Sequence, residues 1–272
     1  MTSAIVYLNE KFVQEKKAFI PATDRGFLFG EGVFTTIKVN DGIPELLHLH
    51  LEKLECDCYQ LGIILQKISD QLIDELIEKN NAQSGIWRLK IIASRGERLG
   101  LDCEKWSVGQ FLITLKPYAG HAFPCRLTCY PYPMGNPSGR VKSLSRLDSF
   151  WIADYAKEHG FDDALVLDHQ GRVLETAFAN LFWRSGNILF YPDPVLPLYQ
   201  GVTLQIVLAA AKKMGLHSSP VQVRLADILE DVQMYQCNSL KGIVPVACID
   251  NRNFNRDLPF EYSLIDELDP VV

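Results

Sequence analysis

The chain has 272 residues, of which 47% are apolar and 22% are charged, which is typical of a globular protein with one large or two modest domains. Its net charge of −6 argues against a nucleic-acid partner, because such proteins usually carry an excess of basic residues. The seven cysteines form no CxxC pair, the N-terminus has no signal-peptide pattern and no apolar run could span a membrane, so we expect a cytoplasmic protein with reduced thiols, no membrane partner and no metal site.

Up to residue 118 the sequence predicts an antiparallel sheet with two helices. AIVYLNEKFV is typical of a hairpin that turns at Asn9 and Glu10, and GVFTTIKV predicts a strand followed by a turn at residues 40–42. Ser69 is expected to cap the second helix, and IWRLKIIAS and QFLITLKPY predict two further strands. The first helix follows from apolar residues that recur at spacings of four and three: Leu47, Leu51, Leu54, Cys58 and Leu61.

After residue 118 the pattern restarts, which predicts a second domain over residues 119–272. CRLTCYPY predicts a strand, and the loop after it is rich in proline and glycine, as functional loops often are. A helix is expected over residues 145–159, with Gly160 directly after its end. DDALVLD, RVLE, NLFWR and NILFY predict short strands joined by turns, and VTLQIVLAAAKKMG predicts a helix that Gly215 ends.

Lys142 lies in the short polar stretch GRVKSLSRL, just before the expected helix. A solvated loop lysine is the ordinary interpretation of such a residue. A lysine that acts as a nucleophile needs a partly desolvated site that lowers its pKa, so that the neutral amine is available. The residues around Lys142 do not decide between the two interpretations.

Glu175 follows 33 residues later, at the end of GRVLE. A carboxylate at the end of a strand is usually a surface charge. If it faced a heteroaromatic nitrogen, however, it would keep that nitrogen protonated, which is what the electron sink of pyridoxal phosphate requires. Both interpretations remain open for this residue.

Two further stretches have features of a phosphate site. In YQGVTLQIVL, Val202 and Thr203 open the expected helix, where free N–H groups and the positive end of the helix dipole attract anions. In CNSLKGIVPV, the hydroxyl of Ser239 could supply a second side of a phosphate cradle. Each stretch taken alone is more commonly an ordinary helix start or an ordinary turn.

The stretch DRGFLFGEGVFTTIKV contains Gly30 and Gly32, but no third glycine and no helix follow at the right spacing, so it does not predict a dinucleotide site. Thr35 and Thr36 are neighbours on the expected strand and must face opposite sides of it. G-x-S-x-G, H-E-x-x-H and P-loop patterns are absent from the sequence.

Taken together and in order, several of these stretches resemble the fold-type IV pyridoxal-phosphate enzymes, a family of branched-chain aminotransferases, D-amino acid aminotransferases and 4-amino-4-deoxychorismate lyases. The matching segments span nearly the whole chain: DRGFLFGEGVFTT, HLEKL, WRLKIIASRG, VKSLSRL, DDALVLDHQGRVLETAFANLFW, GVT and NSLKGIVPV. The resemblance implies an α+β fold with two domains, like that of D-amino acid aminotransferase. We expect a small N-terminal α/β sandwich over residues 1–118 and a larger, β-barrel-like C-terminal domain with helices over residues 119–272.

The resemblance also implies the cofactor, pyridoxal 5′-phosphate, and a role for each matching residue. Lys142 is expected to bond covalently to the cofactor and to move the proton, with Thr36 as a helper nearby. Glu175 is the implied partner of the pyridine nitrogen. The other implied cofactor-binding residues are Lys53, Asn180, Val202, Thr203 and Ser239.

Lys53 departs from the family pattern. The family uses an arginine for the phosphate in H-L-x-R-L, whereas this chain reads HLEKL. A lysine still neutralises a phosphate as a point charge, but it lacks the two-pronged guanidinium that binds two oxygens at once. We therefore expect a phosphate site at the same place with weaker binding.

The choice of reaction depends on smaller differences. Leu147 stands five residues after Lys142, where the family's aminotransferases carry a tyrosine, and FTT and NSL also resemble the lyases. The lyase pattern R-G-x-G-x-R-G-Y reads SRGERLGL here, so Arg95 matches, Arg98 is displaced and the tyrosine is missing. We expect a lyase that converts 4-amino-4-deoxychorismate to 4-aminobenzoate and pyruvate for folate biosynthesis, with Arg95 and Arg146 as substrate-carboxylate ligands.

Two alternatives remain. One is an aminotransferase that acts on D- or branched-chain amino acids with 2-oxoglutarate. The other is a catalytically inactive protein that keeps the fold as a binding or assembly module, for which the departure at Lys53 is the supporting feature. In either enzyme the partner is a small-molecule substrate, and the resemblance implies a homodimer with the site near the subunit interface.

Overall fold

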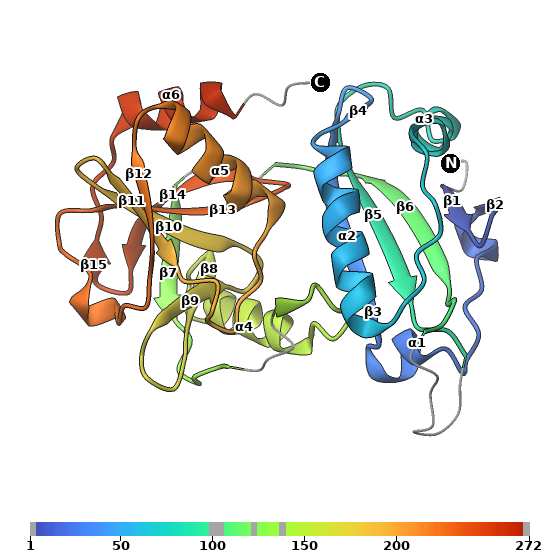
Figure 1. The fold of residues 1–272 in the computed structure, drawn as a ribbon, viewed down its shortest axis with the longest axis horizontal. Helices are drawn as coiled ribbons and strands as arrows, with labels where there is room; N and C mark the ends of the chain where they lie inside the picture. Colours follow the sequence, from blue (N-terminus) through green and yellow to red (C-terminus); the bar gives the residue numbers. More distant parts are fainter. Residues whose placement is uncertain (1–3, 98–105, 121–123, 136–139, 269–272) are drawn as a thin grey trace. The chain divides into compact units, whose positions relative to one another are not determined.

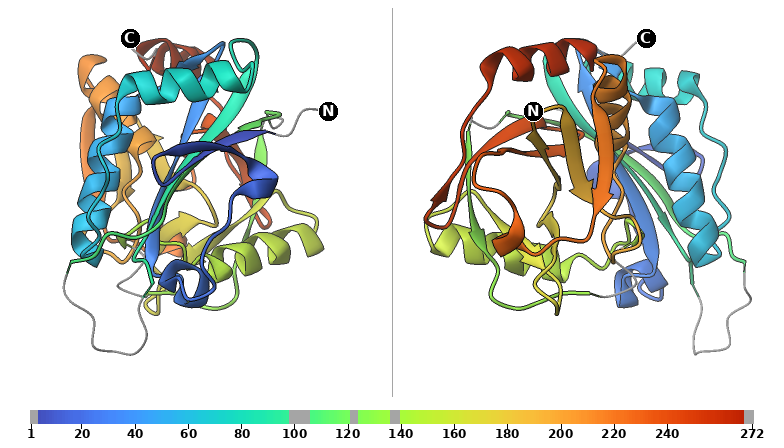
Figure 2. Two further views of the ribbon diagram at one scale, coloured as in Figure 1. Left: turned by 90° about the vertical axis from the view of Figure 1, so that its right-hand side faces the viewer. Right: turned by 60° about the vertical axis from the view of Figure 1, so that its left-hand side comes forward.

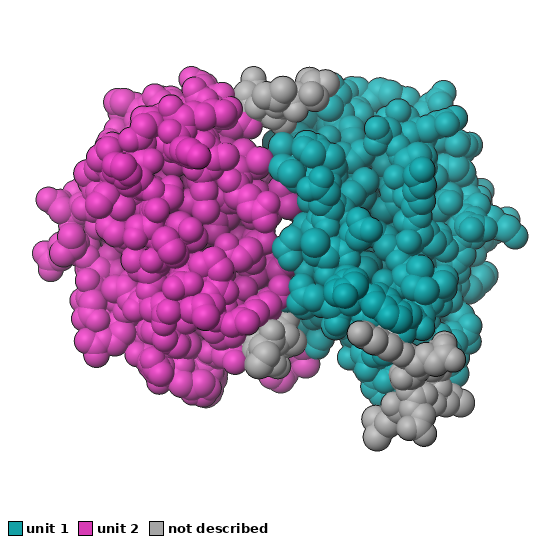
Figure 3. Space-filling view, in the orientation of Figure 1, with its two compact units in different colours: residues 1–120, 141–146, 272 teal, residues 121–140, 147–271 magenta. Residues whose placement is uncertain are grey.

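The computed structural model describes residues 4–97, 106–120, 124–135 and 140–268, which fall into two compact units (Figure 1, Figure 3). Unit 1 contains the described residues up to Gly120 together with the short segment Val141–Arg146, and unit 2 contains the rest. The segment that carries Lys142 therefore packs with the N-terminal unit. None of the helices in the described ranges is long and apolar enough to cross a membrane.

Unit 1 is built on an antiparallel six-stranded sheet in the order β2-β1-β6-β5-β3-β4. The predicted hairpin turns at Asn9 and Glu10, which both have positive φ, at 46° and 70°. This left-handed pair gives the backbone twist that a two-residue hairpin turn needs. The strands are β1 (Ile5–Leu8), β2 (Lys11–Gln14), β3 (Gly32–Asn40), β4 (Ile43–Pro44), β5 (Ile86–Ser94) and β6 (Phe111–Pro117).

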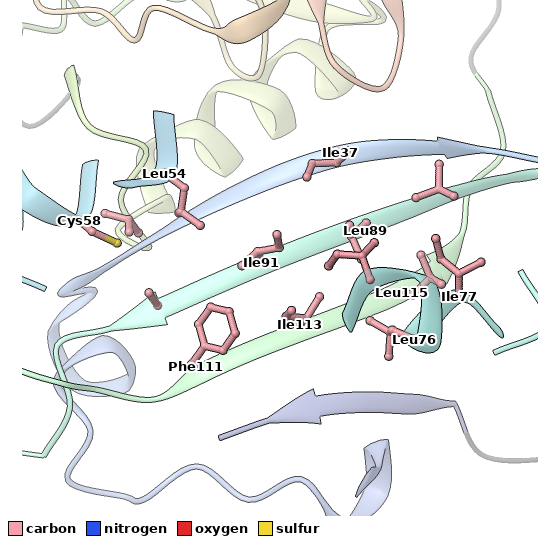
Figure 4. Close-up of a cluster of buried hydrophobic side chains, with 14 of the residues drawn as sticks. Ile37, Leu54, Cys58, Leu76, Ile77, Leu89, Ile91, Phe111, Ile113 and Leu115 are labelled. Atoms are coloured by element: carbon pink, nitrogen blue, oxygen red, sulfur yellow. The ribbon is translucent and has the colours of Figure 1, made fainter. Parts of the chain in front are cut away.

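The helices α2 (Leu47–Leu61) and α3 (Asp70–Lys79) pack on one face of this sheet, where their apolar side chains meet those of β3, β5 and β6 (Figure 4). Ser69 caps α3 as predicted, because its side chain accepts a hydrogen bond from the N–H of Leu72 at 3.2 Å. A short helix α1 (Arg25–Phe29) and a 3₁₀ turn (Glu15–Lys17), neither of them predicted, complete the unit.

Unit 2 is a β-barrel with additional strands. The order β10-β13-β14-β7-β8-β9 closes on itself because β9 also pairs with β10, while β11 and β12 continue the sheet beyond β10 and β15 pairs with β14. Most pairings are antiparallel, but β7 runs parallel to both β14 and β8, and β12 runs parallel to β11. The strands are β7 (Cys125–Cys129), β8 (Asp163–Leu167), β9 (Val173–Thr176), β10 (Asn180–Ser185), β11 (Ile188–Pro192), β12 (His217–Val221), β13 (Gln233–Asn238), β14 (Gly242–Ile249) and β15 (Arg252–Asn253).

Three helices cover the barrel: α4 (Leu147–Glu158), α5 (Val202–Lys213) and α6 (Leu258–Glu267), and a 3₁₀ turn spans Leu225–Asp227. α5 and α6 pack against each other and on β13 (Figure 2). Leu181 and Trp183 belong to one buried cluster and Phe182 to another, so β10 is apolar on both sides. The predicted fold class is confirmed, with an α/β sandwich in one unit and a β-barrel with helices in the other.

Candidate active site

Lys142 lies at the edge of β3 in unit 1. Its carbonyl accepts a hydrogen bond from the N–H of Phe34 at 3.0 Å, and the N–H of Leu144 donates to the carbonyl of Gly32 at 2.8 Å. The side chain is half-buried, and Nζ lies 5.2 Å from the centre of the Phe34 ring. Lys142 is thus held by backbone pairing and stands against an aromatic ring, unlike a lysine on a solvated loop.

The strand β3 presents different groups on its two faces. Thr35 is buried on the face that α2 covers, and its hydroxyl lies 2.9 Å from Nδ1 of His50. Thr36 is half-buried on the opposite face, directly across from Lys90 of β5. The alternation predicted for the two threonines is therefore present, and Thr36 shares its face with Phe34.

Lys90, which the sequence analysis did not single out, adds a second cation beside the Phe34 ring. Its Nζ lies 4.3 Å from the ring centre. Burial lowers the pKa of Lys90, and the positive charges of Arg88 and Arg146 lower it further. Arg146, a predicted substrate ligand, is therefore part of a cationic cluster with Lys90, on the unit that also carries Lys142.

Arg95, the other predicted substrate ligand, belongs to a separate cluster. Its Nη1 lies 3.7 Å from Glu31 Oε2, and Arg25 contacts both oxygens of the same carboxylate at 2.7 and 2.8 Å. The hydrogen bond from Arg25 lowers the pKa of Glu31, although partial burial opposes it. Arg98 lies outside the described residues.

Lys53 points along helix α2 to a buried carboxylate. Its Nζ lies 2.6 Å from Oδ1 of Asp57, a residue whose exposed fraction is 1%. His50, one turn earlier, is also buried, and burial together with the charges of Lys142 and His48 lowers its pKa to about 4. The predicted phosphate cation is therefore in direct contact with an acidic side chain in unit 1.

In unit 2, several predicted cofactor residues gather around the start of β10. Asn180 pairs with Glu175 across β9 and β10, and its Oδ1 accepts a hydrogen bond from the N–H of Gly201 at 2.9 Å. Its Nδ2 donates to the carbonyl of Tyr199 at 2.5 Å, which fixes the side chain in place. Asn180 thereby joins the β9–β10 turn to the segment that leads into α5.

The start of α5 has the character of an anion site. The helix begins at Val202, and no side chain caps its first N–H groups. The hydroxyls of Thr203 and Ser239 lie 3.4 Å apart. A Cβ built on Gly201 would lie 2.7 Å from Asn180 Oδ1, so a larger residue here would require Asn180 or the backbone to shift. Uncapped N–H groups and two hydroxyls form a donor set that fits the phosphate of pyridoxal phosphate.

A buried carboxylate that the sequence analysis missed supports the turn beside Glu175. Asp163 Oδ1 accepts hydrogen bonds from the N–H groups of Ala164 at 2.8 Å and Ala177 at 3.2 Å. Burial raises the pKa of Asp163. Its contact with Ala177 holds the chain just after Glu175, so Asp163 acts on the site through the backbone. Its signal in the sequence is weak, a pair of adjacent aspartates before an apolar strand.

One surface hollow in the described part of unit 1 lies away from these residues. It has a volume of about 360 Å³ beside α3 and contains none of the predicted site residues. Its lining consists of Asp41, Gly42, Ile43, Asp74, Ile77, Glu78 and Gln83.

Comparison with known proteins shows the family to which the chain belongs. The family model of amino-transferase class IV matches residues 32–249, so the chain belongs to this family of pyridoxal-phosphate enzymes. It is 31% identical over 260 residues to a protein of Methanocaldococcus jannaschii provisionally named branched-chain-amino-acid aminotransferase, covering 92% of this chain and 89% of that one. It is 29% identical over 267 residues to the aminodeoxychorismate lyase of Bacillus subtilis, covering 92% and 88%.

Two solved structures resemble nearly the whole chain. A Legionella pneumophila protein provisionally described as a 4-amino-4-deoxychorismate lyase superposes with a TM-score of 0.85 at 29% identity, over 94% of this chain and 96% of that one. The branched-chain aminotransferase of Thermoproteus uzoniensis superposes with a TM-score of 0.87 at 20% identity, over 97% and 93%, which shows the shared fold. The protein is therefore an enzyme of the fold-type IV class that uses pyridoxal phosphate.

Proposed function

We propose that the enzyme is an aminodeoxychorismate lyase, which converts 4-amino-4-deoxychorismate to 4-aminobenzoate and pyruvate. The observation that carries the proposal is the set of residues around Lys142. Thr36 and Lys90 lie on the same unit as Lys142, and Leu147 follows it in the sequence. On the face of the sheet that carries Thr36 of β3, Lys90 of the neighbouring strand β5 supplies a cation, and residue 147 is a leucine without a hydroxyl. The relatives named as lyases support the proposal, while the M. jannaschii relative keeps an aminotransferase as the second candidate.

Each residue would contribute a defined step. Pyridoxal phosphate, when bound, supplies an electron sink for the carbon that carries the substrate nitrogen. Lys142 would hold the cofactor and remove the proton from that carbon, and Glu175 would keep the pyridine nitrogen protonated. The hydroxyls of Thr203 and Ser239, with the first N–H groups of α5, would bind the phosphate.

The cations would orient the substrate. The substrate carries two carboxylates, and a carboxylate is bound most strongly by a cationic donor in a site with little water. Lys90 and Arg146 are such donors on the unit that carries Lys142. We propose that these two residues, and Arg95 where Glu31 leaves it accessible, bind the carboxylates. Thr36, directly opposite Lys90, would help to orient the same group.

A product assay tests the proposal. The purified protein with pyridoxal phosphate should release 4-aminobenzoate, which is measured by its fluorescence, and should form no glutamate from 2-oxoglutarate and an amino donor. Lys142→Ala should abolish the activity and the borohydride-stable attachment of the cofactor, whereas Lys79→Ala on α3, a solvent-exposed lysine paired with Glu75, should retain both. Glutamate formation without 4-aminobenzoate would replace the lyase by the aminotransferase.

We also propose that the enzyme is a homodimer. Each unit has large apolar side chains at its surface: Phe19, Phe27 and Phe29 are 78%, 74% and 60% exposed in unit 1, and Phe150 and Trp151 are 57% and 56% exposed in unit 2. Apolar side chains of this size that stay exposed are candidates for burial at an interaction surface. Sedimentation of the purified protein should give twice the mass of the chain. The double variant Phe27→Ser, Phe29→Ser should sediment with the mass of a single chain. A wild-type monomer at micromolar concentration would refute the dimer.

A further inference from the structure

Helix α2 carries a charged residue where its packing calls for an apolar one. Its buried residues are His50, Leu54, Asp57 and Cys58, and Leu54 and Cys58 belong to the hydrophobic core of unit 1. Asp57 lies among them with an exposed fraction of 1%. Burial of a carboxylate is strongly unfavourable unless an opposite charge and hydrogen bonds compensate it. The contacts of Asp57 therefore show what this charge does in the fold.

The two oxygens of Asp57 have different partners. Oδ1 binds Nζ of Lys53 at 2.6 Å, and Oδ2 accepts from the backbone N–H of Lys142 at 3.4 Å. The first contact is a short, charge-assisted hydrogen bond. The second is at the long end of the range for a hydrogen bond, so it is weaker than the first, but it still directs the peptide toward the carboxylate. Asp57 thus links the cation on its own helix to the segment that carries the candidate catalytic lysine.

The peptide groups of Lys142 are held from two sides. Its N–H points to Asp57 on α2, and its carbonyl accepts from Phe34 on β3 at 3.0 Å. With both backbone groups fixed, the direction in which the side chain leaves the main chain is also fixed. Precise placement of a reacting group within about 0.5 Å is what a catalytic site needs from its surroundings.

We propose that Asp57 is a positioning residue for Lys142, and that Lys53 serves as its counter-ion. This inference rests on the proposed function, in which Lys142 is the residue that attaches the cofactor. Asp57 contacts the backbone N–H of Lys142 and would act on the lysine through that backbone. Lys53 compensates the buried charge of Asp57, so Lys53 should be replaceable by an apolar residue without loss of stability only when Asp57 is replaced as well.

Four variants separate positioning from simple stability. Lys53→Met leaves a buried carboxylate without its counter-ion and should lower the thermal midpoint. Lys53→Met with Asp57→Leu removes both charges and should restore the midpoint, since buried ion pairs can be replaced by apolar residues without loss. Asp57→Asn keeps an oxygen that can accept from Lys142. Lys142→Ala tests the proposed function on its own.

Two measurements report on Lys142. The first is hydrogen exchange of its backbone amide in the cofactor-free protein, and the second is the fraction of bound cofactor that borohydride fixes to the chain. We expect exchange to be roughly two- to tenfold faster in Lys53→Met with Asp57→Leu, the range that the loss of one hydrogen bond gives. The fixed fraction should be lower in the double variant than in Lys53→Met, which lacks the same lysine but keeps Asp57, and it should be retained in Asp57→Asn.

The outcomes distinguish the positioning role of Asp57 from the proposed function of Lys142. A stable Lys53→Met, Asp57→Leu protein with wild-type amide exchange and a wild-type fixed fraction overturns the positioning role. Cofactor that remains fixed in Lys142→Ala overturns the proposed function instead. If Asp57→Asn does not fold, the comparison of the double variant with the wild type still decides, because it does not depend on Asp57→Asn.

Discussion

Gly201→Ala should weaken both the fold of unit 2 and the binding of the cofactor, and the cause is one atom. A Cβ at this position would lie 2.7 Å from Asn180 Oδ1, well inside contact distance. Asn180 cannot move aside freely, because its Oδ1 and Nδ2 are both hydrogen-bonded and the residue is buried. Overpacking of this kind costs about 1–3 kcal/mol.

The backbone itself does not oppose the substitution. Gly201 has φ −76° and ψ 154°, which alanine adopts without strain. Alanine also restricts the unfolded chain and so stabilises a compatible site by about 0.4–1 kcal/mol. The predicted loss therefore comes entirely from Asn180, and it should vanish when that side chain is shortened.

A double-mutant cycle measures this dependence. In the wild-type background Gly201→Ala should lower the free energy of unfolding by about 1.3 kcal/mol, the difference between the midpoints of the two ranges above. In the Asn180→Ala background the same change should be neutral or slightly stabilising, so the coupling should be about 1–3 kcal/mol. Urea unfolding of the four cofactor-free proteins gives these values. Additive effects would show that Gly201 and Asn180 do not meet as the structure places them.

Three further changes test other parts of the molecule. Glu10→Gly should stabilise unit 1 by about 0.5–1 kcal/mol, because Glu10 has φ 70° in the hairpin turn, and thermal unfolding measures it. Burial and neighbouring charges lower the pKa of His50 to about 4, so the stability that its neutral form contributes is complete above its unfolded pKa of about 6.5. That stability is lost as the pH falls toward 4, by up to about 3 kcal/mol. Urea unfolding at pH 7 and pH 5 should therefore give a smaller difference in the free energy of unfolding for His50→Gln than for the wild type. Lys90→Met should lower kcat/KM for the dianionic substrate roughly tenfold or more without loss of the attached cofactor, and an unchanged kcat/KM would remove Lys90 from the substrate site.

Most of the fold could be predicted because periodicity and caps are local signals. The spacing of the leucines gave α2, Ser69 gave the start of α3, and Gly215 marked the end of α5. The elements that were missed lack such signals. α1 has only five residues, and β12 (His217–Val221) is polar, contains a proline and pairs only with β11. α6 is the exception among the missed elements, because Asp257 caps it and a proline follows, which is a local signal of a helix start.

The site was harder to predict, because its supporting residues resemble surface residues in the sequence. A carboxylate in a helical pattern is normally solvated, so nothing local marks Asp57 as buried. Lys90 occupies an alternating position of a strand, where a charged residue is expected to face water. The roles of Asp57 and Lys90 become apparent only from the packing of the segment around Lys142 against α2 and β3. Tertiary contacts over long sequence separations decide their roles.

Gly32 matters both for the fold of unit 1 and for the candidate site. The sequence offered no role for it beyond a failed dinucleotide motif. A Cβ at Gly32 would lie 2.5 Å from Leu144 Cδ1 and 2.8 Å from the carbonyl oxygen of Ala93, and its own carbonyl accepts from the N–H of Leu144. A side chain here would push away the strand-like segment that carries Lys142. The glycine at the start of β3 therefore lets the segment that carries Lys142 pair closely with the edge of the sheet. Any larger residue at position 32 should displace that segment, while the opposite, core-facing side of β3 stays packed.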